Sequence, residues 1–204
     1  MKSTKPNYVE PPALMRQKPF SITLLIMGII GWLASGALTL ERLELYKNAN
    51  HVASCDFGLF VSCTSLMKTS QAALLGFPNP LLGVVGFAVL ITIAVVLLTG
   101  VKMPRWFMNG LQVGVTAGLG LITFFWITSV YVVMTLCPWC MVVWAMIIPM
   151  FLLITAYNIY HGNLVRNPSV KLKKFVSEWW WIVAIIVLVG VTGSIFIRFA
   201  EYIF

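Results

Sequence analysis

Charged side chains are scarce in this sequence. Only 10% of its 204 residues are charged, Asp and Glu together number 6, and hydrophobic residues make up 60%. A soluble domain has about 45–50% apolar and about 25% charged residues, and disorder requires low hydrophobicity. Both classes are excluded, and the composition indicates an integral membrane protein.

Residues for hydrolytic or metal chemistry are also few. There are two histidines, no H-E-x-x-H motif, no paired catalytic carboxylates and no glycine-rich phosphate loop. His51 and His161 are expected at surface or interface positions, and Glu41 and Glu44, one helical turn apart, on a solvated face. No metal site is predicted.

The chain contains five continuous apolar runs. A helix needs about 20 apolar residues to cross about 30 Å of hydrocarbon, and the runs lack the alternation of barrel strands. We therefore expect an all-α membrane protein whose residues 1–204 form a single membrane domain. The expected helices span residues 20–40, 81–99, 106–136, 139–160 and 179–199. A cleaved signal peptide over 1–37 is disfavoured, because its apolar run exceeds the usual length of about 7–15 residues.

The distribution of Lys and Arg predicts the orientation. With the N-terminus inside, ten basic residues lie on the inner side and four on the outer side, which satisfies the positive-inside rule. The inner ones are Lys2, Lys5, Arg16, Lys18, Lys102, Arg105, Arg166, Lys171, Lys173 and Lys174. Topology thus accounts for the net charge of +8, and a nucleic-acid surface is the poor alternative.

Two further features concern the loops and the helix faces. The outer segment Glu41–Pro80 is far longer than the other connections, and long connections usually have a function. Within it, Ser65–Leu75 is expected to form a short helix. Gly110, Gly114 and Gly118 are spaced four apart, and we interpret them as a smooth face for close helix packing.

All four cysteines are predicted on the outer side. Cys55 and Cys63 lie in the long segment, and Cys137 and Cys140 lie where the third helix gives way to the fourth. In bacteria this side is oxidising. If Cys137 is the N-cap, Pro138 takes the first helical position without cost. The helix terminus then stabilises a thiolate, and Cys140 lies deeper in the membrane.

Other interpretations of the cysteines stay open at this point. A Cys₄ zinc site suits C-x₂-C, but the spacing from Cys55 to Cys63 is wide for the second pair. The cysteines could also form static disulfides in a membrane scaffold or metal-binding protein. A quinone-linked disulfide oxidase of an unrelated family is a further alternative.

The motifs resemble those of the vitamin K epoxide reductase family. They are Cys55-Asp56 with Cys63, then residues 76–83 (GFPNPLLG), and then Cys137-Pro138-Trp139-Cys140. More closely, the chain resembles the bacterial members that support disulfide formation, in the form without a fused thioredoxin-like domain. The resemblance implies a four-helix bundle around a quinone pocket, with a fifth transmembrane helix added.

The resemblance also implies roles for individual residues. Cys137 and Cys140 would be the redox pair beside the quinone, which would be menaquinone or ubiquinone, and Cys55 and Cys63 the shuttle pair. Asn79 would hydrogen-bond a quinone carbonyl, and Trp144 falls where some members carry a ring-contacting Tyr. Ser65–Leu75 would cover the pocket. The expected function is that of a thiol:quinone oxidoreductase in disulfide bond formation.

The expected partner and location follow from the same resemblance. The partner would be a separate extracytoplasmic thioredoxin-fold (DsbA-like) protein. The location would be the bacterial plasma membrane, with the N-terminus cytoplasmic and the cysteines on the extracytoplasmic side.

Overall fold

Five long helices make up most of the protein. The computed structural model describes residues 11–58, 60–74 and 76–203; Lys2, Lys5 and Leu75 lie outside these ranges. The helices are α1 (Gln17–Lys47), α3 (Pro80–Leu98), α4 (Arg105–Ile127), α5 (Pro138–Tyr160) and α6 (Val170–Ile203). All five are long and apolar enough to cross a membrane. The described ranges contain isolated β-bridges but no strand, so the all-α prediction is confirmed.

Two of these helices extend beyond the apolar runs that predicted them. α1 continues past Leu40 to Lys47, and α6 begins at Val170 rather than at Trp179. Charged residues end an apolar run, but Glu, Leu, Arg and Lys all favour helix. The helices therefore continue into the aqueous boundary, which hydropathy alone does not show.

The prediction of one helix over residues 106–136 is wrong at its outer end. α4 passes at Thr128 into a π-helical turn, Thr128–Val133, which ends at Met134 in the left-handed region (φ 57°). The Thr135 N–H donates to the Ser129 carbonyl at 3.0 Å, and the Ser129 hydroxyl donates to the Thr135 carbonyl. These bonds end the helix before Cys137. Such π-turns are frequent at functional sites.

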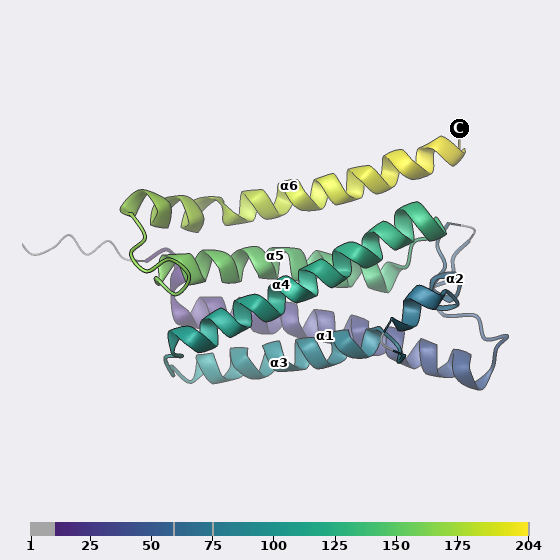
Figure 1. Cartoon of the computed structure of the whole chain (residues 1–204), viewed down its shortest axis with the longest axis horizontal. Coiled ribbons are helices and arrows are strands. Elements are labelled where there is room, and N and C mark those ends of the chain that lie inside the picture. Colours follow the sequence, from purple (N-terminus) through teal and green to yellow (C-terminus); the bar gives the residue numbers. More distant parts are fainter. Residues whose placement is uncertain (1–10, 59, 75, 204) are drawn as a thin grey trace, which may run out of the picture.

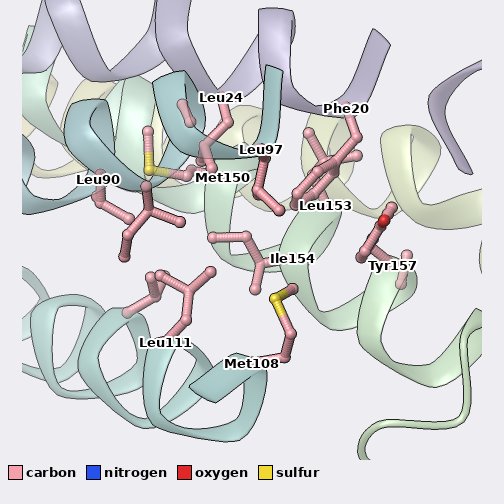
Figure 2. Close-up of a cluster of buried hydrophobic side chains, with 14 of the residues drawn as sticks. Phe20, Leu24, Leu90, Leu97, Met108, Leu111, Met150, Leu153, Ile154 and Tyr157 are labelled. Atoms are coloured by element: carbon pink, nitrogen blue, oxygen red, sulfur yellow. The ribbon is translucent and has the colours of Figure 1, made fainter. Parts of the chain in front are cut away.

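The helices form a bundle with α6 on its outside. α1 packs mainly on α3 and α5, while α4 packs on α5 and runs obliquely across the bundle (Figure 1). α6 packs on α5. The largest buried cluster draws on α1, α3, α4 and α5 (Figure 2), and Phe20 stacks on Tyr157 with ring centroids 3.9 Å apart.

The outer segment contains two short helices in place of the single one expected over Ser65–Leu75. α2 spans Cys63–Met67, and a 3₁₀ helix spans Ser70–Ala73. The Ser62 hydroxyl accepts a hydrogen bond from the Ser65 N–H at 3.1 Å, so α2 begins earlier than hydrophobicity indicated.

Candidate functional site

The four cysteines meet at one end of the bundle. Cys55 and Cys63 form a disulfide, and Cys137 and Cys140 are free thiols. The Sγ atoms of Cys63 and Cys137 lie 3.1 Å apart. Both of these side chains are buried. The sequence left open which cysteine of the outer segment meets Cys137, and in the structure it is Cys63.

Backbone pairing brings these two cysteines together. The Leu136 N–H donates to the Phe60 carbonyl at 2.8 Å, and the Ser62 N–H donates to the Leu136 carbonyl at 3.0 Å. Val61 and Leu136 thereby form an isolated parallel bridge. Cys63 and Cys137 follow this bridge within two residues on their respective segments, so the bridge sets the distance between their sulfurs.

Cys137 is the N-cap of α5, as predicted. Its backbone is extended, Pro138 begins the helix, and its sulfur accepts a hydrogen bond from the Cys140 N–H at 3.4 Å. A hydrogen bond from the Cys140 side chain, together with the backbone N–H groups of Cys140 and Trp139, lowers the pKa of the Cys137 thiol although burial opposes this. The Cys140 side chain and the helix terminus together therefore favour a thiolate at Cys137.

The residues around Cys55 are held by hydrogen bonds to α2. The Asp56 carboxylate accepts one from the Thr64 N–H at 3.1 Å, and the Thr64 hydroxyl accepts one from the Ala53 N–H at 2.9 Å. Burial raises the pKa of Asp56, but hydrogen bonds from Thr64 and its neighbours outweigh it and lower the pKa. Asp56 therefore stays an anionic acceptor that ties the Cys55 segment to α2.

Glu41 ties the same segment to the end of α1. Its carboxylate accepts hydrogen bonds from the N–H (3.1 Å) and the hydroxyl of Ser54, and its other oxygen lies 2.8 Å from Nε2 of His51. The Glu41 side chain is only 16% exposed, so its prediction as a solvated residue is wrong. Glu44 is 53% exposed and pairs with Lys47, as a solvated residue does.

Replacing Glu41 with alanine is expected to loosen the segment that precedes Cys55. Hydrogen bonds to a partly exposed charged acceptor contribute about 1–2 kcal/mol, so the Ser54 amide should exchange its hydrogen roughly 5- to 30-fold faster. Hydrogen–deuterium exchange measures this directly. Glu44→Ala, one turn away with an exposed side chain that pairs with Lys47, is the matched control. Equal exchange in both variants would show that Glu41 does not hold the segment.

A cavity of about 960 Å³ lies between α3 and α4. At the cysteine end its lining includes Cys137, Cys140 and Asn79, and towards the other end it includes Trp106. The lining is almost entirely apolar. A thiol pair thus faces a membrane-embedded hydrophobic cavity, which suits an apolar reaction partner.

Within the bundle, the glycine face is a packing surface only at Gly118, where a Cβ would lie 3.8 Å from Ile147 of α5. Gly110, Gly114 and Gly118 line the cavity, and a Cβ at Gly110 or Gly114 would meet no atom within 4 Å. Spacing shows that three small residues share one side of a helix. It does not show whether a helix or a cavity faces that side.

The structure places Asn79 at the cavity and Trp144 away from it. Asn79 is buried at the cavity, its Oδ1 accepts from the Leu74 N–H at 3.0 Å, and its Nδ2 donates to the Gln71 carbonyl at 2.6 Å. An amide nitrogen carries two hydrogens, so one is left for a ligand. Trp144 is not brought to this cavity and packs on Ile195 and Phe199 of α6.

The helical period explains the position of Trp144. Val143 and Ile147, three and seven residues after Cys140, line the cavity with it. Residue i+4 lies on the other side of that stripe, because each residue advances the helix by about 100°. The indole therefore points towards α6, a helix that lies outside the motifs on which the resemblance rests.

A cysteine pair at the end of an apolar cavity, within a bundle of membrane-length helices, defines a multi-pass membrane oxidoreductase acting on thiols. The sequence profile of the vitamin K epoxide reductase family matches residues 22–155, more than half of the chain. The chain therefore belongs to this family. Its members in general are membrane thiol–quinone oxidoreductases that work with a thioredoxin-like partner. No curated protein and no solved structure matches the chain.

Proposed function

We propose that this protein reoxidises an extracytoplasmic thioredoxin-fold protein and passes the electrons to a quinone, in support of disulfide bond formation. The observation that carries the proposal is the 3.1 Å contact between the sulfurs of Cys63 and Cys137. Thiol–disulfide exchange proceeds by direct attack of one sulfur on another. The contact supports electron transfer between the two cysteine pairs without a further carrier.

The first half of the proposed route runs through the outer segment. A dithiol of the partner reduces the Cys55–Cys63 disulfide and itself becomes a disulfide. The Cys63 thiolate then attacks Cys137 of a Cys137–Cys140 disulfide and releases the Cys140 thiolate. Cys55 next attacks Cys63 and releases Cys137. The products are a Cys55–Cys63 disulfide and two free thiols, the arrangement described above.

The partner is proposed to react at Cys55. Cys63 faces Cys137, whereas Cys55 lies in a segment with two exposed apolar side chains, Val52 and Phe57. Cys55 itself is only 3% exposed, so the segment tied by Glu41 has to move before a partner thiol can attack. The charge count supports an outer, extracytoplasmic position for this end. A bacterial plasma membrane as the location, and residues 1–204 as one membrane domain, belong to the same proposal.

The properties of the two inner thiols suit the second half of the route. Its lowered pKa makes Cys137 a good leaving group when Cys55 resolves the mixed disulfide. Cys140 lies one helical turn further into α5 and lines the cavity. We therefore assign electron transfer to the acceptor to Cys140, after which Cys137 and Cys140 form a disulfide.

The cavity suits a quinone. It is apolar and long, and the second amide hydrogen of Asn79 is available to a carbonyl oxygen at its polar end. Asn79 would hold the head group and the glycine face of α4 the apolar tail. When bound, a quinone supplies a two-electron, two-proton acceptor. Menaquinone and ubiquinone both fit this chemistry.

Replacing Gly114 with leucine is expected to weaken quinone use. A Cβ at Gly114 meets no atom within 4 Å and Gly114 lines the cavity, and leucine favours helix over glycine by somewhat under about 1 kcal/mol, so the fold should persist. The KM for quinone should rise about tenfold or more, equivalent to about 1.4 kcal/mol of lost binding.

Gly120→Leu is the matched control for this prediction. Gly120 is on the same helix with equally open surroundings, but it does not line the cavity. Steady-state kinetics at saturating dithiol compare the two variants. An unchanged KM in Gly114→Leu would remove the cavity from the quinone path.

A trapped mixed disulfide tests the proposed route. In the double variant Cys55→Ser/Cys140→Ser, only Cys63 and Cys137 remain, and mild oxidation should link them in nearly all molecules. Cys63→Ser/Cys140→Ser leaves Cys55 with Cys137 and should link far less. Peptide mapping by mass spectrometry identifies the products. Equal linkage in both variants, or none in the first, would contradict the assignment of Cys63.

A further inference from the structure

We propose that the reduced protein binds a trivalent thiophilic ion, such as arsenic(III), through the sulfurs of Cys55, Cys63 and Cys137. These three Sγ atoms all lie within 4.8 Å of one another, and all three side chains are buried. Sulfurs that share one metal ion at about 2.3 Å lie close to 4 Å apart. The Cys63 and Cys137 sulfurs, 3.1 Å apart, need only a small adjustment, and the Cys55 and Cys63 sulfurs separate to this spacing once their disulfide is reduced. This site goes beyond the proposed function and does not depend on it.

Reduction makes the three sulfurs available together. Two electrons from a dithiol or a phosphine convert the Cys55–Cys63 disulfide to two thiols, and Cys137 is already a thiol. Bonds other than the disulfide hold the segments in place, namely the bridge between Val61 and Leu136 and the Asp56–Thr64 hydrogen bond. The sulfurs are therefore expected to stay together after reduction.

The surroundings favour a trivalent ion over a divalent one. The three cysteines pack in a cluster with Leu38, Ala53 and Met67. A zinc ion bound to three thiolates carries a net negative charge and seeks a fourth ligand, and burying an unpaired charge is costly. Arsenious acid reacts with three thiols to give a neutral trithiolate and three water molecules, without a change of oxidation state. That product needs no fourth ligand.

Binding at this site would block the electron route at three of its four sulfurs. The fourth, Cys140, does not belong to the group of three and stays free. This distinguishes the site from an ordinary vicinal dithiol, in which Cys137 and Cys140 would bind the ion together.

The test uses the full-length protein in detergent, reduced with a phosphine and titrated with sodium arsenite. Intact mass and thiol alkylation report stoichiometry and the cysteines involved. We expect one arsenic per chain, three protected thiols and a Cys140 that still alkylates. Protein with the Cys55–Cys63 disulfide intact should bind far more weakly, which provides a control without any substitution.

Four variants separate the possible ligand sets. Cys55→Ser, Cys63→Ser and Cys137→Ser should each lose binding at an arsenite concentration that saturates the unsubstituted protein, whereas Cys140→Ser should keep it. Binding lost in Cys140→Ser but retained in Cys55→Ser would assign the ion to the vicinal pair and overturn the proposal. Stoichiometric zinc retained as firmly as arsenic would overturn the preference for a trivalent ion. None of these readouts requires quinone turnover.

Discussion

Cys140→Ala is expected to abolish quinone reduction while leaving exchange at the outer disulfide intact. Cys140 is the thiol of the proposed inner pair that lies deeper in α5 and lines the cavity. Loss of a nucleophile typically lowers kcat by on the order of 10⁴–10⁶. Quinol formation with a dithiol donor should therefore fall to the uncatalysed rate.

The same variant contains its own control. The Cys55–Cys63 disulfide remains, so Cys140→Ala should still oxidise one equivalent of a dithiol in a single turnover and then stop. Rapid-quench alkylation measures that equivalent, and quinol absorbance measures the continuous reaction. Sustained quinone turnover in Cys140→Ala would refute the assignment of Cys140.

Cys55→Ala is expected to stop delivery of electrons from a protein donor while sparing a small dithiol. In the proposed route a folded thioredoxin-fold donor reacts at Cys55. A small dithiol is expected to exchange with the Cys137–Cys140 disulfide without that step. Turnover with the protein donor should fall to background, and turnover with the small dithiol should stay within a few-fold of the unsubstituted protein.

Comparing the two donors in one assay tests the shuttle role directly. If Cys55→Ala loses turnover with both donors equally, the outer disulfide has a structural role and the two-pair route is wrong. Glu44→Ala, which removes an exposed carboxylate paired with Lys47, should behave like the unsubstituted protein with both donors.

Features encoded by local chemistry could be predicted from the sequence. Five apolar runs predicted five long helices, and Cys137 followed by Pro138 predicted the N-cap that the structure has. Both follow from rules that act within a few residues, namely hydropathy over about 20 positions and the preferences of helix termini.

Features that depend on the facing element could not be predicted. Nothing within the sequence of α4 shows that a cavity rather than a helix faces Gly114, and nothing near Glu41 shows that Ser54 returns to it. The choice of Cys63 over Cys55 depends on the bridge between Val61 and Leu136, segments 75 residues apart in the chain. Long-range pairing of this kind leaves no periodic signal in either segment.

The most direct test of the central claim is acid-quenched thiol alkylation, read by mass, on reduced detergent-solubilised protein before and after the addition of quinone. The account predicts that Cys137 and Cys140 become a disulfide and that quinol forms in matching amount. Thiols that stay unchanged in the presence of quinone would contradict it and leave the cysteines with a structural or metal-binding role.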